Sequence, residues 1–98
     1  MGPFVYVTGT TATDDTGHLV GVGDPHAQAA QALRNVKWAL EQAGATMEDI
    51  VRTRIYVKHI ADWEQIGRAH REALGHVMPA TSMIEVSRMI DSDMLVEI

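Results

Sequence analysis

The most constraining feature of the sequence is an amphipathic helical pattern over residues 24–44. Five apolar residues recur at alternating steps of four and three and make one stripe: Ala29, Leu33, Val36, Leu40 and Ala43. Asp24 can cap the first free N–H groups, Pro25 suits the first helical position, and Gly44 ends the pattern. The sequence therefore predicts a helix here that buries one face, with Gln28 among the polar residues of its outer face and Trp38 at the edge of the stripe.

Strand patterns lie on both sides of this helix. Residues 4–9 and 18–22 are rich in β-branched and aromatic side chains, and the turn-forming segment between them predicts a hairpin with a long connection. Residues 50–58 alternate apolar with polar side chains, as expected for a half-buried strand.

A second helical pattern begins after Asp62, where Gln65 would complete a capping box, and ends at Gly75. Its apolar stripe is Trp63, Ile66, Ala69 and Ala73. Strands over residues 82–88 and 94–98 follow, separated by a turn at 91–93. The order ββαβαββ predicts an α+β fold with two helices on one face of a mixed sheet, and we expect residues 1–98 to form a single domain.

Length and composition narrow the function classes. The chain has 98 residues, a net charge of −5 and no Cys, so neither a disulfide nor a thiol nucleophile is available. A domain this small buries only somewhat above ~60% of its unfolded surface, which favours association with other copies. The acidic charge disfavours nucleic-acid binding. No apolar run approaches the ~20 residues that span a bilayer, and no leader pattern opens the chain. These features predict a cytoplasmic protein with neither membrane nor nucleic-acid partners.

Metal and phosphate sites are not predicted. The five His residues, at positions 18, 26, 59, 70 and 76, include no pair spaced i, i+4 on a helix, so surface or helix-face roles suffice for them. The glycines at 9, 17, 21 and 23 match neither common phosphate-binding spacing, and Asp24 would repel a phosphate at the helix start. We interpret these glycines as turn residues.

Charged side chains in strands offer further candidates. Arg52, Arg54 and Lys58 share one strand face, which could bind a carboxylate; a solvated face, or one paired with acids of a neighbouring subunit, is the favoured interpretation. Glu85 and Glu97 lie in apolar strands, where an acid either faces water, as favoured here, or sits in a pocket that raises its pKa. Local features alone leave the function open.

An ordered set of short segments over nearly the whole chain resembles one known family. The segments are Val7-Thr8-Gly9, Gln31-Ala32-Leu33-Arg34-Asn35-Val36-Lys37, Ala43-Gly44, Asp49-Ile50-Val51-Arg52-Thr53, Tyr56-Val57-Lys58, Pro79-Ala80-Thr81-Ser82, Glu85-Val86-Ser87-Arg88 and Val96-Glu97-Ile98. The sequence resembles the RidA/YjgF family in this set. The resemblance implies a chorismate-mutase-like fold, a homotrimer and small-molecule clefts between subunits. It also implies hydrolysis of imines and enamines to 2-oxo acids and ammonia, without a metal or other cofactor.

The resemblance assigns roles to particular residues. Glu97 aligns with the acid that positions the attacking water, and Thr8, Gly9 and Ser82 align with cleft residues. Thr81 stands where the family has an Arg that holds the substrate carboxylate, and Thr cannot form that bidentate pair. The loss of this charge-assisted contact is worth ~1.5–3 kcal/mol.

Two hypotheses follow from Thr81. One is a hydrolase of imines or related metabolites that does not use the family's Arg, with Arg88 or Arg54 as a substitute charge. The other is a non-catalytic module that binds a small metabolite, such as one that bears a carboxylate, on the same trimeric scaffold. Ribonuclease activity is disfavoured, because the chain lacks a basic-aromatic platform.

Overall fold

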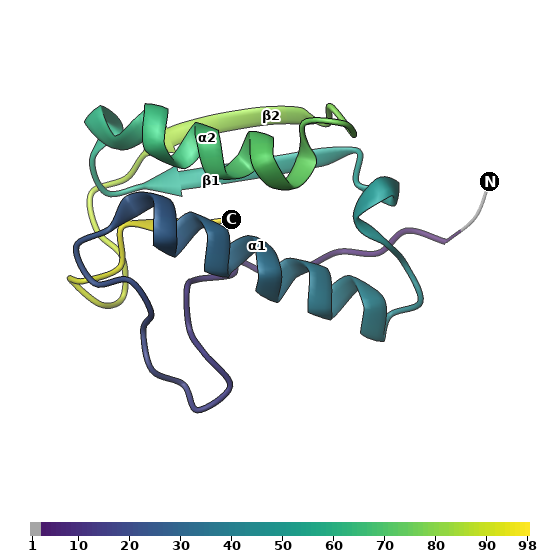
Figure 1. Cartoon of the computed structure of the whole chain (residues 1–98), viewed down its shortest axis with the longest axis horizontal. Coiled ribbons are helices and arrows are strands. Elements are labelled where there is room, and N and C mark those ends of the chain that lie inside the picture. Colours follow the sequence, from purple (N-terminus) through teal and green to yellow (C-terminus); the bar gives the residue numbers. More distant parts are fainter. Residues whose placement is uncertain (1–2) are drawn as a thin grey trace.

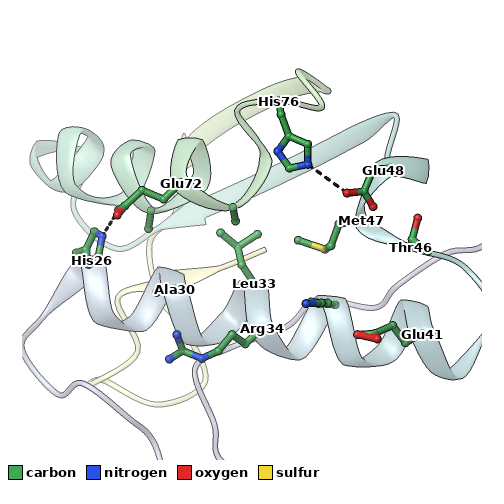
Figure 2. A pocket seen from close by; sticks show the side chains of 13 residues that line it. His26, Ala30, Leu33, Arg34, Glu41, Thr46, Met47, Glu48, Glu72 and His76 are labelled. Carbon is green, nitrogen blue, oxygen red and sulfur yellow. Dashed lines mark hydrogen bonds and ion pairs between the residues drawn. The ribbon is translucent and has the colours of Figure 1, made fainter.

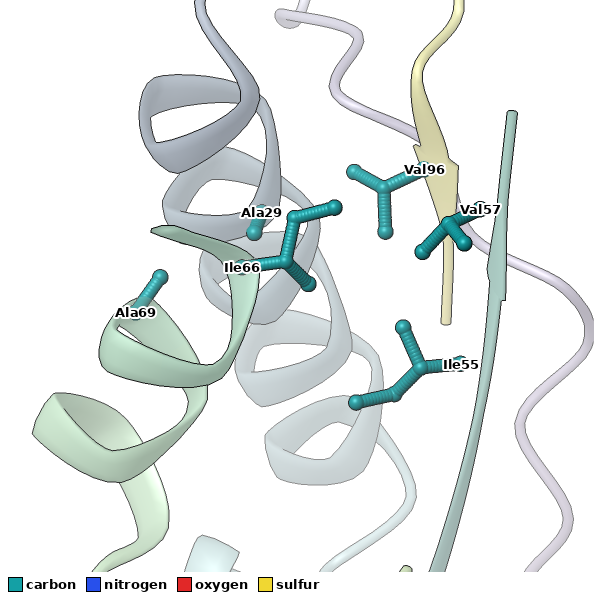
Figure 3. Close-up of a cluster of buried hydrophobic side chains, with 6 residues drawn as sticks. All are labelled: Ala29, Ile55, Val57, Ile66, Ala69 and Val96. Carbon is teal, nitrogen blue, oxygen red and sulfur yellow. The ribbon is translucent and has the colours of Figure 1, made fainter. Parts of the chain in front are cut away.

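The computed structural model describes residues 3–98 and places two helices against one face of a three-stranded sheet (Figures 1 and 3). In chain order the elements are α1 (Pro25–Gln42), the 3₁₀ turn η1 (Met47–Asp49), β1 (Arg52–Val57), the 3₁₀ turn η2 (Ile60–Asp62), α2 (Trp63–Leu74), β2 (Ala80–Glu85) and β3 (Val96–Glu97). The predicted α+β class is confirmed. None of the helices in this part of the chain is long and apolar enough to cross a membrane.

The central strand of the sheet is β1. It pairs in parallel with β2, which α2 connects to it, and antiparallel with β3. The parallel register joins Thr53 to Thr81, and the antiparallel register joins Tyr56 to Glu97. Parallel neighbours require a crossover connection, and α2 supplies it. The strand β2 is therefore one edge of the sheet and β3 lies on the other side of β1.

The helix α1 begins and ends as predicted. The Asp24 carboxylate accepts a hydrogen bond from the Ala27 N–H at 3.0 Å, Pro25 occupies the first turn, and Gly44 has a φ of +82°. The stripe is buried except at its end. Ala43 is exposed because it is already the C-cap and leaves the helical phase, and Trp38 is 66% exposed.

The placement of Gln28 contradicts its prediction as an outer-face residue, since its side chain is fully buried. Its amide donates to Gly21 O at 3.2 Å and to Asp93 O at 2.8 Å, and it accepts from the Leu95 N–H at 2.8 Å. These three bonds satisfy the buried amide and tie α1 to the chain that leads into β3.

The core has two apolar clusters. The first, between the helices and the sheet, contains Ala29, Ile55, Val57, Ile66, Ala69 and Val96 (Figure 3). The second lies under the C-terminal half of α1 and contains Leu33, Val36, Leu40, Met47 and Leu74. Alternate residues of β1 enter the first cluster, as its period-two pattern predicted.

The start of α2 differs from the prediction. Asp62 makes no side-chain cap; η2 runs directly into α2, and the Asp62 and Trp63 N–H groups donate to His59 O and Ile60 O. The Asp49 carboxylate caps η1 instead, accepting from the Thr46 backbone N–H at 2.9 Å. Trp63 is 56% exposed, so Leu74, which is fully buried, extends the apolar face in its place.

The predicted N-terminal hairpin is wrong. Residues 4–9 form no strand and are largely exposed, while Leu19, from the predicted second strand, makes a single bridge to Thr13. Sheet pairing begins only at Thr10, which exchanges two backbone hydrogen bonds with Ile98, at 2.8 and 2.9 Å. Strand propensity describes fit to a neighbouring strand, and nothing in the described chain pairs with residues 4–9.

Candidate functional site

The face of the sheet opposite the helices carries polar side chains and no helix from the described part of the chain. We call it the open face. The sheet register assigns to it Arg52, Arg54, Tyr56, Ala80, Ser82, Ile84 and Glu97. Both guanidinium-bearing residues are exposed, and neither forms an ion pair within residues 3–98. Lys58 is the third basic residue predicted on this face, and its ammonium donates a hydrogen bond to Ser92 O at 2.5 Å.

Glu97 lies on this face against Gly9. The Thr10–Ile98 backbone pair brings the two residues together, and a Cβ atom on Gly9 would lie 2.5 Å from Glu97 Oε2. No hydrogen bond from residues 3–98 engages the carboxylate, which is half-buried. The missing side chain of Gly9 therefore leaves room for an acid whose oxygens are free to accept a proton or bind water.

The neighbouring Thr8 is exposed, and its carbonyl accepts a hydrogen bond from the Thr10 hydroxyl at 2.8 Å. Gly9 also lines a cavity of about 820 Å³ between the N-terminal segment and α1, together with Thr10, Thr13, Gln31, Asn35 and Trp38. The Asn35 amide anchors this segment by donating to the carbonyls of Thr11 and Thr13, at 3.0 and 2.8 Å.

Thr81 and Ser82 are adjacent on β2 but point to opposite faces. Ser82 is opposite Arg54 on the open face, and the Thr81 hydroxyl faces the helix side. Because β1 separates β2 from β3, Thr81 and Glu97 lie two strand spacings apart, roughly 10 Å, before their offset along the strands. Within one chain Gly9 thus contacts Glu97 and Arg54 lies opposite Ser82, whereas Thr81 and Glu97 are not in contact.

A line of hydrogen bonds connects Thr81 to α2. Its hydroxyl lies 2.8 Å from the Thr53 hydroxyl, which in turn lies 2.9 Å from His70 Nε2. Thr53 is buried, and burial lowers the pKa of the half-buried His70. The sequence analysis gave His70 a surface or helix-face role and did not predict its contact with Thr53. Two signals could have found it: Thr53 falls in the buried phase of β1, and His70 follows Ile66 by one helical turn.

The sequence analysis also did not predict a groove between α1 and α2 (Figure 2). It encloses about 650 Å³ over an apolar floor that includes Leu33 and Met47. His26 and Glu72 meet at 2.6 Å at one end, and His76 and Glu48 at 3.2 Å at the other. The hydrogen bond from His26 lowers the pKa of Glu72. The two pairs hold α2 to α1 and to η1.

Within residues 3–98, no three His, Asp or Glu side chains gather closely enough to hold a metal ion. Glu85, the other strand acid, accepts a hydrogen bond from the Ile60 N–H at 2.9 Å and so caps η2. The candidate site is therefore the open face, where the register of the described strands places one acid, Glu97, and the hydroxyls of Tyr56 and Ser82.

Comparison with known proteins relates the chain to one family. The family model described as "Endoribonuclease L-PSP" matches residues 1–98. A RutC family protein of Pyrococcus abyssi is 35% identical over 98 residues, which cover 99% of this chain and 76% of that protein. The 3-aminoacrylate deaminase RutC of Acinetobacter baylyi is 31% identical over 94 residues, covering 96% and 74%.

A solved structure agrees with these matches. Rv2704 of Mycobacterium tuberculosis, described as a member of the YjgF/YER057c/UK114 family, superposes with a TM-score of 0.81 and 46% sequence identity. The match covers 93% of this chain and 70% of that one.

Proposed function

The chain belongs to the RidA/YjgF family, and we propose that it is a cofactor-independent hydrolase of small imines or enamines that does not use the family's Arg. The observation that carries the proposal is the unengaged Glu97 carboxylate, held beside Gly9 on the open face. The name of the RutC relative, a deaminase of 3-aminoacrylate, supports this substrate class.

The reaction needs one proton-accepting group beside the electrophilic carbon. Glu97 takes a proton from a water molecule as the water oxygen adds to the carbon of the C=N bond, and the nitrogen gains a proton. The carbinolamine then collapses: the C–N bond breaks, ammonia leaves, and the carbonyl of a 2-oxo acid forms. One water is consumed and one ammonia released, so neither a metal nor a redox partner is required.

Arg54 is the group we propose for the substrate carboxylate. It lies directly opposite Ser82 and is the diagonal neighbour of Glu97 across the β1–β3 pair. Diagonal neighbours of this kind have Cβ atoms roughly 7–8 Å apart, within reach of an Arg side chain. A small 2-imino acid could then contact the guanidinium with its carboxylate while its reacting carbon lies toward Glu97.

The proposed assembly is a cytoplasmic homotrimer with clefts between its subunits. Support comes from apolar side chains that one chain leaves exposed near the open face and the β2 edge: Val51, Met78, Ile84 and Ile90. Thr81 and Glu97 are apart within a single chain, but in such an assembly Thr81 of one copy would approach Glu97 of another.

The second candidate is a non-catalytic module that binds a small metabolite in the same cleft. The residue that favours it is Thr81, which stands in place of the family's Arg. RNA cleavage, which the family description names, is opposed by the net charge of −5.

Hydrolysis of freshly generated 2-imino acids tests the proposal. The parent protein should be active, and Glu97→Gln should lower the rate by ~10²–10⁴-fold, the usual contribution of a general base. Glu85→Gln is the matched control, because its amide oxygen can still accept from Ile60. Inactivity of both the parent and Thr81→Arg would overturn the hydrolase proposal in favour of the binding module.

A further inference from the structure

Three polar side chains form a continuous line from α2 to the β2 edge. His70 Nε2 lies 2.9 Å from Thr53 Oγ1, Thr53 Oγ1 lies 2.8 Å from Thr81 Oγ1, and the Thr81 hydroxyl donates to Pro79 O at 3.1 Å. Thr53 is only 7% exposed, so water does not compete for its hydroxyl. A buried hydroxyl of this kind is held by its protein partners alone.

The number of protons along this line permits two arrangements. Each hydroxyl carries one hydrogen and can accept as well as donate, whereas neutral imidazole has one N–H and one lone pair. With the proton on Nε2, His70 donates to Thr53, Thr53 donates to Thr81, and Thr81 donates outward. With the proton on Nδ1, every bond reverses: Thr81 donates to Thr53, and Thr53 donates to His70.

The two arrangements present different chemistry at the exposed end. In the outward arrangement the single Thr81 O–H, which donates to Pro79 O in this structure, can turn to a ligand acceptor, such as a carboxylate or carbonyl oxygen. In the inward arrangement Thr81 Oγ1 becomes an acceptor and Pro79 O loses its donor, so two acceptors lie side by side. That pair suits an amine or iminium N–H group.

The backbone at this end is held in an unusual conformation. Met78, immediately before Pro79, has a φ of +55° and a side chain that is 83% exposed. A left-handed φ is rare for a residue other than Gly, and it is disfavoured further before Pro. The surrounding structure therefore holds the backbone just before Pro79 in this conformation at some conformational cost.

We propose that His70, acting through Thr53, sets whether the Thr81 hydroxyl donates or accepts a hydrogen bond, and is thereby a specificity-determining residue. This inference rests on the proposed function, because it places Thr81 at the ligand cleft. Linkage makes the effect reciprocal: a ligand that supplies an acceptor favours the Nε2–H form of His70, and one that supplies N–H donors favours the Nδ1–H form.

The coupling is tested first on the ligand-free protein, by the side-chain ¹⁵N NMR shifts of His70. Thr81→Val should change the ratio of the two His70 tautomers although, within residues 3–98, the Thr81 side chain hydrogen-bonds to Thr53 and Pro79 and not to His70. In the Thr53→Val background, the same change at 81 should have no effect. Ser82→Ala, on the opposite face of β2, is the matched control. Unchanged His70 shifts in folded Thr81→Val would overturn the coupling.

The ligand effect is tested with acetate and methylammonium as probes. Acetate should move His70 toward the Nε2–H form and methylammonium toward Nδ1–H, with opposite signs, and Thr53→Val should abolish both shifts. Shifts of the same sign, with both probes perturbing the Thr81 amide, would overturn the specificity role. If neither probe perturbs Thr81, the cleft assigned under the proposed function is wrong, while the coupling is judged by the ligand-free result.

Discussion

Gly9 and Glu97 are in such close contact that a Cβ atom on Gly9 would lie 2.5 Å from Glu97 Oε2 and 2.8 Å from its carboxyl carbon. The two residues come from segments far apart in the sequence, joined by the Thr10–Ile98 backbone pair. The three heavy atoms nearest to a Cβ at position 9 all belong to the end of the Glu97 side chain. The glycine therefore determines where the carboxylate lies.

A methyl group at Gly9 should displace the carboxylate without unfolding the protein. Gly9 does not have a left-handed φ, so Ala fits its backbone. We expect Gly9→Ala to lower imine hydrolysis by at least tenfold at an almost unchanged Tm, and to have no further effect in a Glu97→Gln background. Gly67→Ala, in open space within α2, is the control and should leave activity unchanged while stabilising the fold by roughly 0.5–1 kcal/mol. Full activity in Gly9→Ala would show that the close contact has no role.

Removal of the Arg54 charge should raise KM for carboxylate-bearing substrates. A charge-assisted hydrogen bond is worth ~1.5–3 kcal/mol, so Arg54→Gln should raise KM by about 10- to 100-fold. Arg52→Gln removes the same charge from the same face two residues farther from Glu97, and it should have a smaller effect. Equal effects of the two variants would point to general electrostatic attraction instead of a specific contact.

Loss of the Gln28 amide should destabilise the fold. Gln28→Met keeps the size of the side chain but removes its bonds to Gly21, Asp93 and Leu95. Each buried group left without a partner costs ~1–3 kcal/mol. We expect urea denaturation to show a loss of at least 2 kcal/mol in unfolding free energy, and hydrogen exchange to increase at Leu95. Gln31→Met, a half-buried neighbour, should have a smaller effect; equal losses would contradict the anchoring role.

Acidification should reduce stability through His70. Burial lowers its folded-state pKa from the ordinary 6.5, so the unfolded chain binds a proton more readily than the folded chain. This contribution is complete above about pH 6.5, and it is lost as the pH falls through the folded pKa. His70→Gln should flatten the dependence of Tm on pH below about pH 6.5. A slope identical to that of the parent would refute the assignment.

Sedimentation should show three chains per particle. Each chain has a mass of 10.8 kDa, and the open face leaves Ile84 49% exposed at the edge strand β2. Ile84→Glu places a charge on this face and should favour the monomer, whereas Thr16→Glu, in the exposed 14–18 turn, should not. A parent protein that remains monomeric at micromolar concentration would contradict the proposal that the cleft lies between subunits.

The sequence predicted the helices and the central strand well because their signals are local. Asp24, Pro25 and Gly44 delimit α1, and the alternation in β1 identifies its buried face. Residues 4–9 were wrongly assigned to a strand, because propensity cannot supply a neighbouring strand. Gln28 was misplaced for a related reason: its three partners lie up to 67 residues away.

The candidate site was predicted only in part, since resemblance identified Glu97 and Gly9 but not the geometry that joins them. That geometry depends on long-range pairing, which no short pattern records. The Thr53–His70 contact likewise joins a strand to a helix, although a hydroxyl in the buried phase of β1 was a usable signal. The resemblance assigned Thr81 and Ser82 to one cleft because they belong to one motif, yet strand alternation places their side chains on opposite faces.

The strand that carries Glu97 has only two residues, and the other one is Val96, which is fully buried. A slip of one residue against β1 would exchange them, placing the valine in solvent and the carboxylate among Ile55, Val57 and Ile66. Burying an unpaired charge there carries a heavy penalty, so this alternative register is strongly excluded. An apolar neighbour outside the candidate site thus keeps the Glu97 carboxylate on the open face, and we expect a polar substitution at Val96 to abolish the proposed activity by releasing this register.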